Sequence, residues 1–381
     1  MGDKIKILHI TTDSKIGGTE KMLVSLAEHF DRNRFEMVFA TLIGKGGLLD
    51  ELSKRNCRVY GLQMRNKLDM IKILKLYSII KKEKPDIVNT YLYHGDQAGR
   101  ILAKLAGVKK IVSSYRSPDY WKKKRHIILD SFTARFADAF TSNSEIVKNV
   151  VSEREKIDKN KIKVIPNGIK LENYKIDFEE KKKEARLLKK NFGIPEENPI
   201  AGIVANLTPV KNYKLFIDIC AGLNRNFHNI SFVSIGSGPE LKNIEKYASE
   251  KKVGNIRFLG HIPGVRNVLR MFDVFVLTSL WESSSRAVLE AMAEGVPVVI
   301  PDVGGLTELV SDFESGFLCG VSNDCGNPQD EYTEKISMLI NDAELRKKFS
   351  ENALEKVKEN FTIEKFIKSV SEFYESVYRK N

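Results

Sequence analysis

The sequence of 381 residues contains few cysteines and no long apolar run. No stretch approaches the ~20 consecutive apolar residues that a membrane-spanning helix needs. The N-terminus passes from charged residues directly into the strand-like segment Ile5–Ile10, rather than into the apolar core of a signal peptide. These absences predict a cytoplasmic protein.

The few cysteines lack Cys-x-x-Cys spacing and histidine partners, which favours free thiols over a disulfide or a zinc site. They are Cys57, Cys220, Cys319 and Cys325. The sequence also has no internal repeat, no low-complexity tract and no Asp-x-Asp motif of the kind that holds a divalent metal. A small disulfide-rich domain, a repeat protein and a disordered chain are therefore not expected.

What the sequence does contain is typical of a globular protein with two domains. Hydrophobic residues make up 42% of the chain, and the length exceeds the size at which a single core keeps growing. The net charge of +12 is uneven, because residues 1–175 hold 35 Lys and Arg against 20 Asp and Glu, whereas the remainder holds 27 against 30. The basic half favours an anionic partner, such as a membrane surface, a phosphorylated acceptor or nucleic acid, although a generally lysine-rich surface would look the same.

Strand-like and helix-like patterns alternate along both halves of the chain, which predicts two Rossmann-like domains, each with a parallel sheet covered by helices. The elements expected in the first half are Ile5–Ile10, Gly18–His29, Glu36–Thr41, Leu48–Arg55, Val59–Leu62, Asp69–Lys82, Ile87–Asn89 and Asp96–Leu105. Those expected in the second half are Asp177–Lys190, Ile200–Ala205, Leu215–Leu223, Ile230–Ile235, Glu240–Glu250, Ile256–Leu259, Val274–Leu277 and Val296–Ile300. The boundary is expected around Leu171–Tyr174.

The segment Leu280–Leu309 carries the strongest functional signal. Glu282 and Glu290 bracket seven residues, and Arg286–Ala293 is expected to form one helix after a serine-rich turn. At 3.6 residues per turn, a separation of eight places both carboxylates on nearly the same face, roughly 12 Å apart along the axis. One ligand could then contact both, although two such residues taken alone would also suit a solvated helix face.

This block resembles the Glu-x7-Glu signature of the retaining glycosyltransferases of family GT4, which have the two-domain GT-B fold. Five further segments match motifs of the family in the same order, so the resemblance spans nearly the whole chain. They are Gly17–Lys21, Val164–Ile169, Leu207–Asn212, Ile235–Pro239 and Phe258–Gly260. Each is weak alone, because Gly-x-Gly loops are common, but six in series rarely arise by chance.

The resemblance implies two α/β Rossmann-like domains that face a central cleft. Residues 1–172 would form the acceptor-binding domain and residues 173–361 the donor-binding domain. Near the C-terminus, Phe366, Val370, Phe373 and Val377 recur at helical spacing, which predicts a helix with one buried face. By resemblance this helix, within residues 362–381, crosses back onto the N-terminal domain.

The resemblance also implies a metal-independent donor site, in which helix N-termini, loop amides and basic side chains neutralise the diphosphate of a nucleotide sugar. Lys211 is the best basic candidate, whereas Asn206 occupies the place of a family arginine and is uncharged. Glu290 would bind the ribose hydroxyls and Glu282 would lie against the donor sugar, because a carboxylate accepts hydrogen bonds from vicinal hydroxyls. The other donor-binding candidates are Gly17, Gly18, Gly236, Gly238, Ser283, Ser284, Ser285 and Arg286.

Two short segments beside Glu282 and Glu290, one of glycines and one of serines, are suited to donor binding for local reasons. Gly304 and Gly305, before a helix expected near Leu306, would let the backbone approach a phosphate closely. The serines from Ser283 to Ser285 replace a glycine that the family usually has after the first glutamate, so their hydroxyls would substitute for backbone contacts to the sugar.

Two further catalytic candidates belong to the N-terminal half. Arg116, in Ser113–Pro118, occupies the position of a histidine in many GT4 members. An arginine is not a base at neutral pH, but it stabilises developing phosphate charge, as a retaining reaction requires when the leaving diphosphate takes the acceptor proton. His94 follows a strand at the edge where α/β proteins bind ligands, although a structural histidine at a helix start is equally consistent with the sequence.

The segment Tyr115–Arg125 places three aromatic rings beside five cations. Such clusters anchor proteins at lipid headgroups, and they also hold single-stranded nucleic acid. No nucleic-acid-binding motif accompanies the cluster, so an anionic membrane is the expected partner and nucleic acid is not. The membrane or acceptor residues predicted from it are Tyr120, Trp121, Lys122, Lys123, Lys124 and Arg125.

These patterns together predict a retaining hexosyltransferase that is peripheral on the inner face of the cell membrane. It would transfer a hexose or N-acetylhexosamine from a nucleoside-diphosphate sugar, UDP favoured over GDP, to a glycan or lipid-linked acceptor in the synthesis of cell-surface polysaccharide or glycoconjugate. No cofactor or metal is expected. The alternatives are a GT-B nucleotide-sugar epimerase and a non-enzymatic module that binds sugar nucleotides or nucleic acid.

Overall fold

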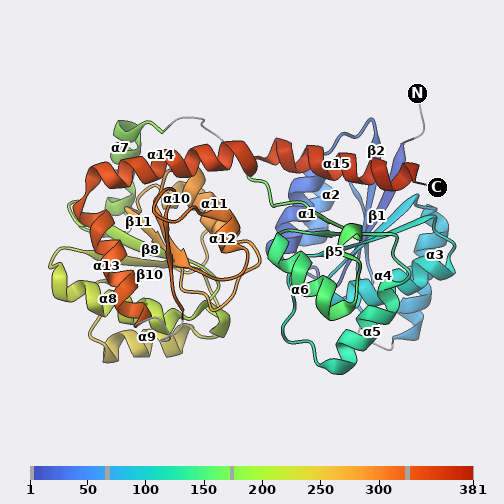
Figure 1. Cartoon of the computed structure of the whole chain (residues 1–381), viewed down its shortest axis with the longest axis horizontal. Coiled ribbons are helices and arrows are strands. Elements are labelled where there is room, and N and C mark those ends of the chain that lie inside the picture. Colours follow the sequence, from blue (N-terminus) through green and yellow to red (C-terminus); the bar gives the residue numbers. More distant parts are fainter. Residues whose placement is uncertain (1–3, 65–68, 172–175, 322–326, 381) are drawn as a thin grey trace. The chain divides into compact units, whose positions relative to one another are not determined.

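The computed structural model describes residues 4–64, 69–171, 176–321 and 327–380 (Figure 1). The chain divides into two compact units, one of residues 1–168 and 363–381 and the other of residues 169–362. The boundary predicted between residues 172 and 173 lies outside the described residues. Within the described ranges, no helix has the length and apolar character needed to cross a membrane.

The first unit is built on a parallel sheet of seven strands in the order β3-β2-β1-β4-β5-β6-β7. The strands are β1 (Ile5–Thr11), β2 (Phe35–Thr41), β3 (Arg58–Gly61), β4 (Ile87–Tyr91), β5 (Lys110–Tyr115), β6 (Ala139–Ser142) and β7 (Ile162–Val164). The helices are α1 (Gly18–His29), α2 (Leu48–Lys54), α3 (Met70–Glu83), α4 (Tyr93–Leu105), α5 (Lys124–Ala134), α6 (Glu145–Glu155) and α15 (Ile363–Arg379), with a short 3-10 turn at Lys159–Lys161. Parallel pairing requires crossover connections, which α1 to α6 supply between consecutive strands.

The centre of this sheet is buried on both faces, as expected for parallel strands between helices. All five residues of β4 are buried, and Ile7 of β1 is in register with Met37 of β2 and Ile87 of β4. Helix α15 packs into the same core, where it buries Phe366 and Phe373 among other side chains. The predicted buried face of the last helix is therefore confirmed.

The second unit has a parallel sheet of six strands in the order β10-β9-β8-β11-β12-β13. The strands are β8 (Ile200–Val204), β9 (Ser231–Ile235), β10 (Ile256–Phe258), β11 (Val274–Val276), β12 (Val298–Pro301) and β13 (Phe317–Cys319). The helices are α7 (Phe178–Asn191), α8 (Tyr213–Asn226), α9 (Leu241–Glu250), α10 (Arg266–Leu269), α11 (Arg286–Ala293), α12 (Leu306–Leu309), α13 (Pro328–Asn341) and α14 (Ala343–Asn360), and a 3-10 turn, η2, covers Pro209–Lys211.

Two apolar cores cover the two faces of the second sheet. Neighbouring residues of β12 divide between them, because Val298 and Ile300 belong to one core and Val299 to the other. This division follows from the alternation of side chains along a strand. Polar caps fix where the surrounding helices begin: the Asp177 carboxylate accepts from the amide of Glu180 at 3.0 Å at the start of α7.

The predicted fold class is confirmed, since both units are Rossmann-like. Several elements were not predicted: β5, α5, β6, α6 and β7 in the first unit, and β13, α13 and α14 in the second. Cys57, Cys220 and Cys319 are free thiols, and the remaining cysteine, Cys325, lies outside the described residues.

Candidate active site

In the second unit, most of the predicted donor residues lie in loops that follow parallel strands, so they share the carboxyl edge of one sheet. Asn206 and Lys211 follow β8, Gly236 and Gly238 follow β9, and Glu282 follows β11. Ligands of open α/β sheets bind at this edge. The structure therefore gathers these residues along one side of the second unit.

The two predicted key residues contact each other, because the ammonium of Lys211 pairs with Oε1 of Glu282. The Ser279 hydroxyl donates to the same carboxylate oxygen at 3.0 Å. The loops that carry the two residues are tied together, since the Thr278 hydroxyl donates to the Lys211 carbonyl at 3.0 Å. Both charged side chains remain partly exposed, which keeps this ion pair accessible to a ligand.

Glu290 lies in a different setting. It is buried on α11, where Oε1 accepts from Nε of Arg286, one turn earlier, at 2.9 Å. Ser285 caps this helix with its hydroxyl. Glu282 precedes the helix and has no helical conformation, so the prediction that Glu282 and Glu290 share one helix face was wrong. The serine-rich turn separates them instead.

The glycines near these residues have a structural role that the sequence did not predict. Gly304 has φ +56°, and a Cβ there would lie 1.9 Å from the carbonyl oxygen of Glu282. The amide of Gly305 donates to that carbonyl at 3.0 Å. A Cβ on Gly236 would likewise lie 1.9 Å from the Ala205 carbonyl oxygen. These glycines fix the loops that carry Glu282 and Asn206, because no other residue allows so close a backbone approach.

In the first unit, Gly17 is the N-cap of α1 and Gly18 is its first residue, at the end of the loop that follows β1. The Gly17 amide donates to Oε2 of Glu20 at 3.1 Å, which satisfies one of the helix's first N–H groups. Burial raises the pKa of Glu20. A Cβ on Gly18 would meet no atom within 4 Å, so this is the glycine of the two whose backbone faces open space.

Arg116 lies directly after β5, and its guanidinium donates to the Asn167 side-chain oxygen in the loop after β7. Burial lowers the pKa of Arg116 to about 10, which leaves it cationic at neutral pH. Asn167 was part of a quoted motif but was not predicted as a site residue; its place in the loop directly after a strand was the available signal. His94 lies in the first turn of α4, and its ring contacts that of Tyr93.

A buried polar cluster beneath Arg116 was missed. The Asn89 amide donates to the hydroxyls of Tyr91 at 2.8 Å and of Tyr374 at 2.6 Å, and so connects β4 with α15. Burial lowers the pKa of His9, which contacts the Tyr91 hydroxyl at 3.1 Å, to about 3. Arg116, Asn89, Tyr91 and Tyr374 line one small cavity, and His9 is not among its lining residues.

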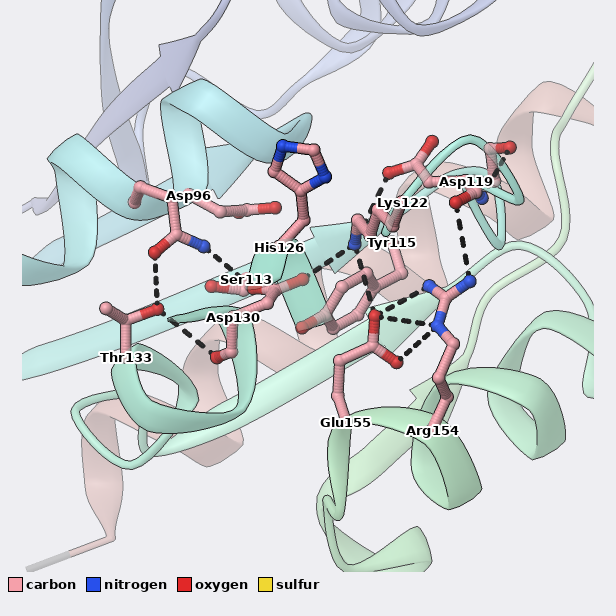
Figure 2. A network of polar contacts seen from close by, with 12 residues as sticks. Asp96, Ser113, Tyr115, Asp119, Lys122, His126, Asp130, Thr133, Arg154 and Glu155 are labelled. Atoms are coloured by element: carbon pink, nitrogen blue, oxygen red, sulfur yellow. Dashed lines mark hydrogen bonds and ion pairs between the residues drawn. The ribbon is translucent and has the colours of Figure 1, made fainter. Parts of the chain in front are cut away.

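The prediction for Lys122 was wrong. Its side chain is fully buried rather than facing a membrane, and Nζ pairs with Asp130 at 2.6 Å, Glu155 at 3.2 Å and Asp119 at 3.5 Å. Figure 2 shows this network between the loop before α5 and the helices α5 and α6. A lysine in a basic run is buried here because three carboxylates compensate its charge.

Arg100 of α4 extends the network. It pairs with Asp130 at 2.5 Å and donates to the hydroxyls of Ser113 at 2.7 Å and Tyr115 at 2.9 Å. Burial, opposed by the nearby Arg100, raises the pKa of Asp96 to about 7. The charged members of the network are the cations Arg100, Lys122 and Arg154 and the carboxylates Asp96, Asp119, Asp130 and Glu155. A proton on Asp96 would balance three positive with three negative charges.

The other members of the predicted membrane cluster are exposed. Tyr120 and Trp121 are 60% and 54% exposed, and Lys123, Lys124 and Arg125 face solvent. Among the described residues, no group of three or more acidic, histidine or cysteine side chains is placed to hold a metal ion.

Two family models match the chain. The model described as Glycosyltransferase Family 4 matches residues 16–173, and the model described as Glycosyl transferases group 1 matches residues 184–356. The two matches together span most of both units.

Two bacterial glycosyltransferases are similar to this chain, one along nearly its whole length and the other along a smaller part. UDP-Gal:alpha-D-GlcNAc-diphosphoundecaprenol alpha-1,3-galactosyltransferase of Escherichia coli is 28% identical over 97% of this chain and 97% of its own. N,N'-diacetylbacillosaminyl-diphospho-undecaprenol alpha-1,3-N-acetylgalactosaminyltransferase of Campylobacter jejuni is 29% identical over 62% and 60%. Anabaena HepE, solved in complex with UDP, is similar with a TM-score of 0.85 and 21% identity over 97% of this chain and 100% of HepE.

Proposed function

The chain belongs to the family 4 glycosyltransferases, which have the GT-B fold, and we propose that it transfers a hexose or N-acetylhexosamine from a UDP-sugar to a lipid-linked glycan. The proposal of a UDP-sugar and a diphosphate-linked lipid acceptor is supported by the activity for which the Escherichia coli relative is named, since that relative matches along nearly the whole chain. The UDP complex of HepE supports the same nucleotide.

The observation that carries this proposal is the contact between Lys211 and Glu282 at the carboxyl edge of the second sheet, with Glu290 on the adjoining α11. A cation suits the diphosphate, and the two carboxylates suit the hydroxyls of sugar and ribose. Donor binding would require the Lys211 ammonium to exchange part of its contact with Glu282 for a phosphate oxygen.

We propose a retaining transfer in which the leaving diphosphate takes the proton of the acceptor hydroxyl. The bond between the anomeric carbon and the diphosphate breaks, and a bond from the acceptor oxygen forms on the same face of the sugar. Lys211 and the cationic Arg116 would stabilise the negative charge that develops on the leaving phosphate, and no divalent metal would be needed. Asn206 would add a neutral hydrogen bond.

We also propose that the enzyme works at the inner surface of the cell membrane in synthesis of cell-surface polysaccharide. A lipid-linked acceptor would be presented there. The exposed Tyr120 and Trp121, with the exposed cations from Lys123 to Arg125, suit contact with anionic headgroups.

The direct test is transfer from a panel of UDP-, GDP- and dTDP-sugars to polyprenyl-diphosphate acceptors that carry one sugar. Thermal stabilisation would first identify the donor, since a ligand at 100 times its dissociation constant stabilises the folded protein by about 2.7 kcal/mol. Product with the donor's anomeric configuration is the expected result. Epimerised nucleotide sugar without acceptor, or binding of RNA with no transfer to any acceptor, would contradict the proposal.

Lys211 provides a sharper test of the metal-free mechanism. Lys211→Ala should lower turnover by roughly 10²-fold or more, because it removes electrostatic stabilisation of the leaving group. Lys214→Ala is the matched control, since Lys214 is an exposed lysine three residues away on α8. EDTA should leave the parent enzyme active. Loss of activity in EDTA with recovery on adding Mg²⁺ would refute the metal-free mechanism.

A further inference from the structure

Helix α5 has an unusual distribution of side chains, because three of its large apolar residues face solvent. Ile128 is 69% exposed, and Leu129 and Phe132 are also exposed. The only acidic residue of the helix, Asp130, is turned inward to Lys122 and Arg100. The outward face therefore combines apolar side chains with no negative charge from the helix itself.

Cations surround this apolar face. Lys123, Lys124 and Arg125 are exposed at the start of α5, and Arg135 is exposed at its end. A water-facing helix normally mixes both signs of charge, whereas this one presents cations and hydrocarbon alone. Such a combination is the pattern of a helix that lies on an anionic membrane.

Helix α3 buries Leu76, Ile79 and Ile80, but the side away from them also exposes apolar residues. Met70, Ile71 and Leu74 are exposed, Ile71 at 78%. The only acid within the helix, Glu83, is buried, where it accepts from Lys6 and contacts the Arg58 guanidinium. The other charged residues of α3 are lysines, namely Lys72, Lys75, Lys81 and Lys82.

The two helices belong to one layer. Both α3 and α5 pack against α4, and right-handed crossovers from β3 to β4 and from β5 to β6 place them on the same face of the sheet. Figure 1 shows α3, α4 and α5 gathered away from α1, α2 and α15 within this unit. The two apolar faces thus lie on the layer opposite the one that α15 covers.

We propose that the outward faces of α3 and α5 form a docking surface for an anionic lipid bilayer, with Ile71, Leu74, Ile128 and Phe132 among the side chains that enter the headgroup region. This inference rests on the proposed function, because a lipid-linked acceptor brings the enzyme to such a surface. It differs from the surface predicted from the sequence, since α5 and α3 supply the apolar contacts and Lys122 supplies none. Charge complementarity identifies the occupant, as each exposed cation adds to attraction by anionic lipid.

The buried network of Figure 2 has a defined part in this surface. Lys122 and Arg100 hold Asp130 from two sides, at 2.6 and 2.5 Å. Since Asp130 lies between the exposed Leu129 and the exposed Phe132, these contacts fix the rotation of α5 and thereby keep its apolar side chains outward.

Flotation with vesicles tests the proposal on the full-length protein. Vesicles of phosphatidylcholine with a third of phosphatidylglycerol should bind the parent, and vesicles of phosphatidylcholine alone should bind it at least tenfold less. The variant Ile128→Ser/Leu129→Ser/Phe132→Ser and the variant Ile71→Ser/Leu74→Ser should each lower the partition coefficient at least tenfold. A variant of exposed lysines in the second unit, Lys182→Ser/Lys183→Ser, is the matched control and should bind like the parent.

Activity on a water-soluble, short-chain acceptor separates this inference from the proposed function. The surface variants should keep parental turnover on that acceptor and lose turnover on acceptor embedded in vesicles. Vesicle binding by both variants equal to that of the parent would overturn the docking surface, even if transfer is normal. A parent that sediments as a dimer, becomes monomeric in the variants and ignores vesicles would also overturn it, because a second copy would then cover these faces.

Discussion

Lys211, Glu282 and Glu290 differ in what surrounds them, and this difference separates their expected roles. The pair Lys211–Glu282 is partly open to solvent and can rearrange around a diphosphate and a sugar. Glu290 is buried and already holds Arg286, so it offers a fixed acceptor for a ligand group that is always present. A ribose is such a group, because every UDP-sugar carries one.

We therefore expect Glu290→Ala to weaken UDP binding by about 1 to 3 kcal/mol through the loss of charge-assisted hydrogen bonds to the ribose. Titration calorimetry of the parent and of Glu290→Ala, each with UDP and with 2′-deoxy-UDP, completes a thermodynamic cycle. The parent should prefer UDP, whereas Glu290→Ala should bind both equally. A folded variant that retains the full preference would place the ribose elsewhere.

Asp96 gives a prediction about pH. Its pKa is about 7 in the folded protein, because it is buried in a network that already holds Asp130, against about 3.9 in an unfolded chain. The folded state therefore binds more protons between these values, so this group favours folding at low pH and its contribution is lost as pH rises through 7. The Thr90 hydroxyl donates to the Asp96 carboxylate at 2.5 Å, and Asp96→Asn keeps an oxygen that can accept this bond but cannot ionise.

Chemical denaturation at several pH values measures this effect. The free energy of unfolding of the parent minus that of Asp96→Asn should fall by about 1 kcal/mol or more between pH 5 and pH 8. Asp50→Asn, at an exposed aspartate of α2, controls for the substitution itself. Parallel pH profiles for the parent and Asp96→Asn would show that Asp96 stays ionised throughout.

At the scale of single elements, the sequence predicted several strands whose apolar residues are the buried ones. Strands β1, β8 and β9 are of this kind. Helix α5 was missed because its pattern is inverted, with Ile128 and Phe132 exposed and Asp130 buried. Strand β5 was missed because it buries Ser113 and Ser114, whose hydroxyls bond within the core. Local periodicity cannot reveal partners that only tertiary structure supplies.

The same limit explains the errors at the site. Nothing near Lys122 in sequence distinguishes it from Lys123, and its burial depends on Glu155, 33 residues away. The helix-face argument for Glu282 failed because the cap at Ser285 begins α11 only after the serine-rich turn. By contrast, the resemblance to family GT4 grouped Lys211 and Glu282 in one donor site, and the structure brings these two side chains into contact.

At the scale of the whole molecule, the chain leaves the first unit after residue 168 and returns to it at residue 363. The last helix is therefore part of a core whose other members come from the first half of the chain. Tyr374 of α15 accepts a hydrogen bond from Asn89 of β4, 285 residues earlier. Because the last helix of the chain belongs to this core, the first unit is complete only when the C-terminal segment is present.

Ending the chain after Thr362 should therefore unfold the first unit and leave the second intact. The truncation uncovers the apolar surface that Phe366, Val370 and Phe373 bury, and each large core side chain is worth roughly 3 to 5 kcal/mol when it is lost. That loss is comparable with the total stability of a domain. A chain that ends after Val377 is the control, because Tyr378, Arg379 and Lys380, which it removes, are exposed. Hydrogen exchange measured peptide by peptide should show protection lost in β1 and β4 but retained in β8 and β12, and added UDP should still protect the second unit. Equal loss of protection in both sheets would show instead that the two units fold as one, and unchanged protection of β1 would show that α15 is not needed for the first core.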